Sequence, residues 1–481
     1  MGISNKNEQY QSNGVEQKKG FMKKKFVMPH IYVILVAMLV VAYVATLLVP
    51  SGQFSREKGP TGADVLVPGT FEVTKKVYLS ITDLLFAIPT GLIQASEIFF
   101  GILMIGGMFA VFERTGIIEL GISKLATLFS NRGILIIPFL MIPLALLTAF
   151  TGSVELVLVY VPVFIPLMLK LGYDRVTGAA LALISTIAGF TIALTAPATV
   201  GLAQKLVEVE LYSGMGFRSV MFAVILIIGI VFLWRYAVKV KKNPQLSLVY
   251  GDTHIDDEFK VNFTKVDKAT TRQLLASFVL LIGVIVMIYG LINLDWYFKE
   301  LAGLYAVLGI VVGLIAGLKP DVIASSFNDG FKNIILGAAV VGIARAISVI
   351  LAQGQIIDTI VHGLGQIVTM MPHSITPIIM MVVQALLNFV IPSATGQAMI
   401  SMPIMGGLAD ISGVTRQTAV LAYQIGDGFS HIFYPTSGYF MATLALAKIP
   451  YNKWIKFILP LMVIWYLVSA IFLVIAQTMN W

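Results

Sequence analysis

Long apolar blocks separated by short polar segments dominate the chain, and apolar and polar residues rarely alternate singly. A membrane-spanning helix needs roughly 20 consecutive apolar residues, and most of the blocks come close to that length or exceed it. Because backbone groups in lipid must bond within the protein, such blocks predict helices. We expect an all-α polytopic membrane protein with apolar segments at 28–50, 98–113, 133–150, 154–169, 176–203, 216–238, 273–293, 300–318, 333–352, 374–391, 396–409, 416–446 and 455–478.

Two pairs of these blocks are short and are joined without any charged residue. Residues 133–150 and 154–169 are separated by Thr151-Gly152-Ser153, and residues 374–391 and 396–409 by Pro392-Ser393-Ala394-Thr395. We interpret each pair as a re-entrant hairpin, at about 133–169 and 374–409, whose tip stops inside the membrane. Irregular backbone at that depth must be buried in protein or line a wet cavity.

The chain also shows signs of an internal duplication. Residues that break or begin helices recur at a separation of 241 positions: Pro162 with Pro403, Gly172 with Gly413, and Arg175 with Arg416. A second pattern precedes each hairpin, where Ile117-Ile118-Glu119 resembles Ile356-Ile357-Asp358. Chance agreement between similar apolar helices is the alternative explanation.

Basic residues predict the orientation, because cytoplasmic loops are enriched in Lys and Arg. Lys23–Lys25 place the N-terminus inside, and the basic segment 239–272 lies on the same side. Counted from there, the two hairpins open to opposite faces, which is an inverted-topology repeat. The expected organisation is a cytoplasmic polar N-terminus 1–27, a first transmembrane helix 28–50, repeat 1 at 77–238, a cytoplasmic linker 239–272, two connecting transmembrane helices at 273–318, and repeat 2 at 319–478.

Four more polar stretches are predicted to be short helices outside the spans. Residues 78–97 and 319–332 precede corresponding spans, and their composition is typical of amphipathic helices lying along the interface. Residues 117–130 and 355–369 are expected to form matching arms before the two hairpins.

Polar residues gather at two places in each half, the hairpin tip and a break in the helix after it. Pro and Gly interrupt helices, and the freed carbonyls and helix N-termini can bind a cation or a carboxylate. Helix packing and hydrogen bonds of Ser and Thr to their own backbone are the structural alternative. The candidate substrate or ion-binding residues are Thr151, Gly152, Ser153, Glu155, Thr195, Ala196, Thr199, Ser393, Thr395, Gly396, Gln397, Asp427, Ser430, His431, Thr436 and Ser437, with a sodium site expected near Ser153, Thr195, Thr395 and Asp427.

Two of these candidates are acids inside apolar blocks, where a charge costs roughly 2.5–3.5 kcal/mol. Glu155 follows the first tip, and Asp427 lies in the second predicted break, at 426–430 followed by 434–438. Each acid suits a proton or sodium site, or a counter-charge to a substrate amine; a buried ion pair is the structural reading. His431 is a proton relay or a core histidine, and for Arg345 we expect a structural partner such as an interfacial acid.

Composition narrows the function classes. The chain is 58% hydrophobic and only 12% charged, whereas soluble domains contain about 25% charged residues. Its net charge of +8 comes from basic residues beside the spans, which indicates that they set the membrane orientation and do not bind nucleic acid. It has no cysteine and no phosphate-binding Gly-x-x-x-x-Gly-Lys-[Ser/Thr] loop, which disfavours thiolate sites and an ATP-driven pump. A channel and a membrane-embedded enzyme are weaker alternatives to a secondary transporter.

The second half carries specific motifs. These are Gly396-Gln397-Ala398, Met402-Pro403-Ile404-Met405, Gly426-Asp427-Gly428-Phe429, Pro435-Thr436-Ser437-Gly438 and Ala447-Lys-Ile-Pro-Tyr-Asn-Lys-Trp454. They resemble the C-terminal signature of the DcuC/YfcC-type carriers, the C4-dicarboxylate anaerobic carrier family of the ion-transporter superfamily. The resemblance extends from Met28 over nearly the whole chain. The first half departs from the pattern, with a single Glu155 near the tip and Thr195-Ala196-Pro197 in the break.

The resemblance implies elevator-type alternating access by two inverted repeats, often in a homodimer. Members carry dicarboxylates or amino acids, including arginine–ornithine exchange. We therefore expect a secondary active transporter, not an enzyme, in a bacterial cytoplasmic (inner) membrane. Its substrate is a small carboxylate-bearing metabolite, an amino acid such as arginine or ornithine, with a C4-dicarboxylate as the alternative. Sodium, protons or a counter-substrate would drive it, without another cofactor.

Overall fold

The computed structural model describes residues 31–58, 64–252, 255–256, 259, 269–294, 296–373 and 375–481. The predicted N-terminal segment 1–27, with Lys23–Lys25, lies outside these residues, as does part of the predicted linker 239–272. Within the described part the chain is mainly helical, with four very short strands. Seven of its helices are long and apolar enough to cross a membrane.

The first part of the chain contains one long helix, a small strand region and the elements of the first hairpin. The bounds are α1 Ile31–Leu48, β1 Gly52–Gln53, β2 Arg56–Lys58, β3 Asp64–Leu66, β4 Glu72–Val73, α2 Ile81–Gln94, α3 Ser96–Thr115, α4 Ile117–Leu128, α5 Ile136–Thr151, α6 Val157–Lys170, α7 Arg175–Thr191, α8 Leu202–Leu206 and α9 Met215–Lys242. Strand β1 pairs with β4 and β2 with β3, both antiparallel. Short helical turns at Ser130–Leu135, Val154–Leu156 and Pro197–Gly201 precede α5, α6 and α8.

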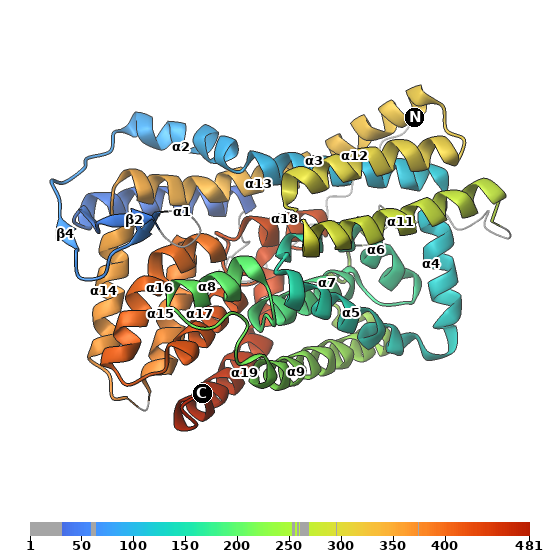
Figure 1. Cartoon of the computed structure of the whole chain (residues 1–481). Coiled ribbons are helices and arrows are strands. Elements are labelled where there is room, and N and C mark those ends of the chain that lie inside the picture. The colour runs from blue at the N-terminus through green and yellow to red at the C-terminus, as the bar shows by residue number, and fades with distance from the viewer. Residues whose placement is uncertain are drawn as a thin grey trace, which may run out of the picture.

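In the second part of the chain, every element among the described residues is a helix. After a short turn at Pro244–Leu246, the bounds are α11 Thr271–Asn293, α12 Phe298–Ile315, α13 Pro320–Gln353, α14 Ile357–Thr369, α15 Thr376–Val390, α16 Ala394–Ile411, α17 Arg416–Ser430, α18 Gly438–Leu446 and α19 Tyr451–Thr478. Helix α7 packs against both α5 and α6, and α17 packs in the same way against both α15 and α16. Helices α4 and α14 stand at opposite ends of the molecule, whereas the long helices run between those ends (Figure 1).

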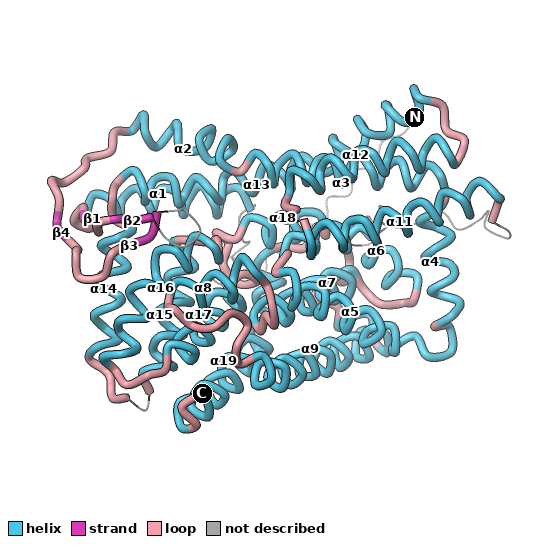
Figure 2. Tube along the Cα trace, in the orientation of Figure 1, coloured by secondary structure: helices cyan, strands magenta, loops and turns pink. Residues whose placement is uncertain are grey.

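Two layers of helices enclose the centre. Helix α13 packs against α2 and α3, and α12 packs against α3 and α11, along one side of the molecule (Figure 1). The hairpin helices, with α7, α17, α9 and α19, form the other side. The two central helices of this second layer, α7 and α17, are buried along nearly their whole length. Loops lie inside the helical body near α18 and not only at its ends (Figure 2).

Helix α13 corrects one expectation from the sequence. Residues 319–332 do not form a separate interfacial helix, because Pro320–Gln353 is one continuous helix of 34 residues. Pro320 occupies its first turn, where a missing backbone donor costs nothing. The polar first part is held against α3, and a Cβ on Gly330 would lie only 2.3 Å from the carbonyl oxygen of Gly106. At 1.5 Å per residue this helix exceeds the roughly 30 Å apolar core of a bilayer, so its polar end extends beyond that core.

Buried ion pairs fix the segments at the two ends of the molecule. At the end that carries the strands, Asp358 of α14 is 5% exposed and accepts hydrogen bonds from the Phe54 backbone and from Arg56. At the opposite end the fully buried Arg175, the first residue of α7, donates to Asp252 at 2.7 Å and to Asp256 at 2.6 Å. Arg56 belongs to the segment with the strands, and Asp252 and Asp256 belong to the segment after α9, so the pairs anchor these connecting segments to the helical body.

Candidate functional site

The first hairpin tip is a tight turn between α5 and the helical turn that begins α6. Gly152 ends α5 in the left-handed conformation, with φ of 74°. A Cβ there would lie 3.0 Å from the Cβ of Ala196, so the tip and the following break touch. The break supplies donors to the end of α5, because the backbone N–H groups of Leu194 and Thr195 donate to the Ala149 carbonyl. Thr195 also donates from its hydroxyl to the Phe150 carbonyl at 3.4 Å.

The second tip is a capped helix start. Ser393 is the N-cap of α16, and its hydroxyl accepts from the Gly396 backbone N–H. Thr395 reaches the other half of the chain, where its hydroxyl donates to the Ala198 carbonyl at 3.0 Å. Gln397 points away from the tip and donates to the carbonyl and the side chain of Gln384. The second tip therefore contacts the first break directly.

Helix α17 corrects a second expectation. The predicted break comprises 426–430 and 434–438. Its first part is wrong, because α17 remains helical to Ser430; the interruption lies at 431–437, which overlaps the second part. The glycines in this stretch allow helices to approach closely. A Cβ on Gly426 would lie 2.3 Å from the Met381 carbonyl, and one on Gly428 would lie 2.6 Å from the Cα of Thr191.

Both tips and both interruptions meet at one central cavity of about 270 Å³. Seven of the candidate residues line it: Gly152, Glu155, Thr199, Ser393, Thr395, His431 and Thr436. The cavity also reaches the opposite layer, from which Gln94, Glu97, Tyr297 and Arg345 line it. The helix starts at Ala394 and Gly438 face this space as well, and a helix N-terminus favours negative charge.

The remaining candidates lie beside or behind the cavity. Ser153 lines a small adjoining void with Glu155 and Tyr297. Thr151 donates to the Leu147 carbonyl and Ser430 to the Asp427 carbonyl, as the structural alternative expects. Ser437 lies 3.3 Å from His431 Nδ1. No contact among the described residues brings together Ser153, Thr195, Thr395 and Asp427, the four residues expected near sodium. The hydroxyls of Thr395 and Thr195 donate to backbone carbonyls, and Asp427 does not line the cavity.

Asp427 forms a fully buried polar cluster behind the cavity. Asn388 of α15 donates to Asp427 Oδ1 at 2.6 Å, and His431 Nε2 lies 3.3 Å from the same oxygen. Asn388 also lies 3.2 Å from His431 Nε2. Asp427 Oδ2 has no hydrogen-bond partner among the described residues. Since His431 itself lines the cavity, this cluster connects the cavity to an acid with one open acceptor.

The sequence interpretation missed part of the site. Asn388 and Gln384 are the two amide side chains in the mainly apolar predicted segment 374–391, a signal that was available. Arg345 donates to Gln94 at 3.2 Å and has no ion-pair partner in the described part of the chain, so the interfacial acid expected for it is not found there. Tyr297 donates to Glu155 Oε1 at 3.3 Å and comes from the connection between the halves, which carried no local signal.

A family comparison decides the class of the protein. Residues 28–478 match the model of the C4-dicarboxylate anaerobic carrier family, DcuC. The chain belongs to this family. It is 33% identical over 392 residues, 79% of its own length and 77% of the relative's, to YfcC of Escherichia coli (strain K12), named as a candidate basic amino acid antiporter. It is also 27% identical to an uncharacterized protein of Haemophilus influenzae, over 94% of this chain and 97% of that one.

Solved transporter structures are more distant. The YdaH transporter of Alcanivorax borkumensis shares 14% identity, with a TM-score of 0.43 over 94% of this chain and 99% of that one. MtrF of Neisseria gonorrhoeae, described as illuminating a class of antimetabolite efflux pumps, shares 17% identity, with a TM-score of 0.40 over 94% and 95% of the two chains. The family match and the apolar helices together make this chain a multi-pass membrane protein of a transporter family.

Proposed function

We propose that this carrier is a secondary active transporter of a small amino acid, bound in the central cavity between the two hairpin tips. The observation that carries the proposal is the presence of both signs of charge in that cavity, Arg345 on one hand and Glu97 and Glu155 on the other. A cavity of about 270 Å³ is slightly smaller than the roughly 300–1,000 Å³ typical of drug-sized ligands, so it suits a metabolite.

The positive part of the cavity suits the carboxylate of the substrate. Arg345 has no acid partner among the described residues, and a guanidinium binds a carboxylate through two parallel hydrogen bonds. The N-termini of α16 and α18 add partial positive charge on the opposite side of the space. The hydroxyls of Ser393, Thr395 and Thr436 are neutral donors for the same group.

The acids favour a substrate that also carries an amine. With both carboxylates ionised, Glu97 and Glu155 repel the second carboxylate of a C4-dicarboxylate and attract an ammonium or guanidinium group. The relationship to YfcC supports a basic amino acid such as arginine or ornithine. A C4-dicarboxylate is the second candidate, supported by the description of the family, and it requires a cation or a proton to neutralise the acids first.

The transport movement is proposed to be of the elevator type between inverted repeats. The corresponding packing of α7 and α17, each against two hairpin helices, and the position of α4 and α14 at opposite ends support the repeats. The layer with α2, α3, α12 and α13 would be the scaffold, and the hairpins with α7 and α17 would move. We further propose proton or sodium coupling through Asp427, a homodimer, and an inner-membrane location with the N-terminus inside.

Uptake into proteoliposomes tests the proposal. Labelled arginine, ornithine, aspartate and succinate are offered with imposed sodium, proton or trans-substrate gradients, to the parent protein and to the Arg345→Gln and Glu155→Gln variants. For an amino acid, both variants lose uptake of the same substrate. For a dicarboxylate, Arg345→Gln loses succinate uptake, whereas Glu155→Gln keeps it or improves it. No gradient-driven flux of any of the four would refute this substrate class.

A further inference from the structure

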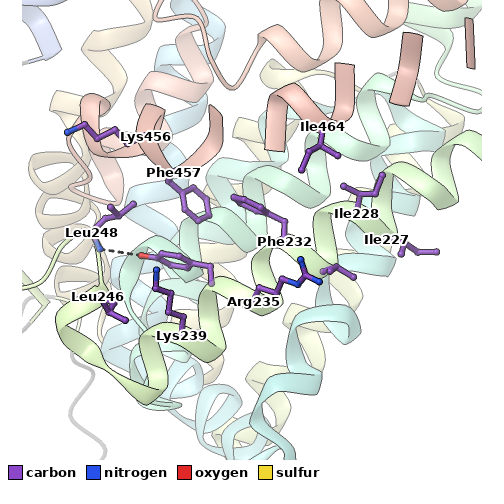
Figure 3. Close-up of a pocket in the computed structure, with 12 residues that line it drawn as sticks. Ile227, Ile228, Phe232, Arg235, Lys239, Leu246, Leu248, Lys456, Phe457 and Ile464 are labelled. Atoms are coloured by element: carbon purple, nitrogen blue, oxygen red, sulfur yellow. Dashed lines mark hydrogen bonds between the residues drawn. The ribbon is translucent and has the colours of Figure 1, made fainter. Parts of the chain in front are cut away.

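A second cavity lies in the groove between α9 and α19 and shares no lining residue with the central cavity. Its volume is about 620 Å³, and most of its lining is apolar (Figure 3). Phe232 and Phe457 face one another across it, with ring centroids 5.2 Å apart, and Tyr236 packs on Phe457 at 4.8 Å. Ile227, Val231 and Ile464 are exposed along its rim, so the groove is open to the surroundings of the helices.

Three basic side chains line the part of the groove where α9 ends and α19 begins: Arg235 and Lys239 of α9 and Lys456 of α19, with the guanidinium of Arg235 pointing toward Ile227 (Figure 3). All three are exposed, and none forms an ion pair with an acid in the described ranges. The nearby connecting segment does not neutralise them, because Asp252 pairs with Arg175 and Lys453, and Asp256 pairs with Arg175. This part of the groove therefore keeps an excess of positive charge.

The spacing of the residues gives the groove a direction and a length. Ile227, Val231, Arg235 and Lys239 are four residues apart, so they form one stripe along α9. From Ile227 to Arg235 the helix rises about 12 Å, which is close to half of the roughly 30 Å apolar core of a bilayer. The stripe changes from apolar to basic over that distance, as the interior of one leaflet changes to its headgroup region.

We propose that this groove is a binding site for an anionic phospholipid. The phosphate group binds to Arg235, Lys239 and Lys456, and one acyl chain lies along Ile227, Val231 and Phe232. Basic pockets between membrane helices are known to hold anionic headgroups. The groove is distinct from the substrate cavity, since the two share no lining residue. Its occupant bridges α9 and α19, which contact each other and pack against α7 and α17.

The test compares the parent protein with an Arg235→Gln/Lys239→Gln/Lys456→Gln variant. The control variant Lys205→Gln/Lys242→Gln/Lys299→Gln removes the same charge from exposed lysines that do not line the groove. Native mass spectrometry in detergent measures the apparent affinity for phosphatidylglycerol, phosphatidylcholine of the same acyl chains, and inorganic phosphate. Each basic residue near a membrane surface contributes about a fivefold factor, so the triple variant should bind phosphatidylglycerol roughly a hundredfold more weakly.

A second variant tests the apolar part. Val231→Trp fills the groove and should weaken phosphatidylglycerol binding while the three basic residues remain. Equal affinity of the parent for phosphatidylcholine and phosphatidylglycerol would overturn the proposal, as would unchanged phosphatidylglycerol binding in the triple variant. Binding of inorganic phosphate as tight as that of phosphatidylglycerol would identify a free-anion site in place of a lipid site. An equal loss of phosphatidylglycerol binding in the control variant would also overturn the proposal, because net charge alone would then explain the loss.

Discussion

The contact between α7 and α17 at Gly428 allows a prediction from packing alone. A methyl group placed on Gly428 would lie 2.3 Å from Thr191 Oγ1, 2.6 Å from its Cα and 2.7 Å from its Cβ. The hydroxyl could rotate away, but the Cα belongs to the backbone of α7 and cannot. Carbon atoms pack at about 3.5–4.0 Å, so Gly428→Ala forces the two helices apart by nearly 1 Å.

The magnitude follows from two opposing terms. Replacing Gly by Ala inside a helix gains about 1 kcal/mol from helix propensity. Overpacking a dense core typically costs about 1–3 kcal/mol and sometimes more, and here the clash is with backbone on a fully buried helix. The net effect should be a loss of stability, accompanied by weaker substrate binding, because His431 follows three residues later and lines the cavity.

The assay is thermal unfolding in detergent, together with the KM of uptake. Gly407→Ala on α16 is the matched control, since no atom lies within 4 Å of the position of its added methyl group. The control should keep or raise the melting temperature, whereas Gly428→Ala should lower it and raise the KM. A melting temperature for Gly428→Ala equal to or above that of the control would refute the close approach of α7 and α17.

Two further predictions concern buried charges. Arg175→Gln leaves Asp252 and Asp256 without their buried partner, so the connecting segment after α9 should become sensitive to limited proteolysis. Partial burial raises the pKa of Asp252. The hydrogen bond from Arg175 and the charges of Lys453 and Arg175 outweigh that effect and hold this pKa below its ordinary value. The stabilising contribution of Asp252 is therefore present above the pKa of its unfolded state and is lost as the pH falls through the lowered value. When the protease sensitivity of the parent protein is measured as a function of pH, it should match that of the variant at low pH only. Asp427→Asn keeps the size of the side chain but removes its charge, so ion-driven accumulation should disappear while substrate exchange persists; accumulation equal to that of the parent would exclude Asp427 from coupling.

Several features of the fold could be predicted because they follow from local physics. Uncharged joints between short apolar blocks marked both helix-to-helix tips, at Gly152 and at Ser393. Asp427 and His431 are four residues apart, a spacing that brings side chains together wherever the helix is intact, and theirs do meet. Such patterns depend on residues close in sequence.

Two of the failures involve glycines that serve helix packing. Gly426 and Gly428 looked like the site of a broken helix, and Gly330 lies in the polar stretch 319–332, whose composition indicated a separate interfacial helix. In each case the missing side chain lets another segment approach within contact distance, and the helix stays intact. A single sequence does not distinguish these two uses, because the partner backbone comes from a segment far away. The pairing of Tyr297 with Glu155 was inaccessible for the same reason.

The division of charge between the two layers leads to a directional prediction. Glu155 belongs to a hairpin tip, whereas Arg345 and Glu97 belong to α13 and α3 of the opposite layer. If the hairpin layer moves as proposed, a bound substrate travels with Glu155 and leaves Arg345 behind. Arg345 therefore contributes to binding from one side of the membrane only, and Glu155 contributes from both.

This asymmetry is measurable in proteoliposomes with the substrate offered from either side of oriented protein. A hydrogen bond to a charged group contributes about 1.5–3 kcal/mol, so Arg345→Gln should raise the KM on one side by roughly 10- to 150-fold. Its KM on the other side should change little, whereas Glu155→Gln should raise both. Equal effects of Arg345→Gln on the two sides would mean that Arg345 moves with the substrate, and the assignment of α13 to a static scaffold would then be wrong.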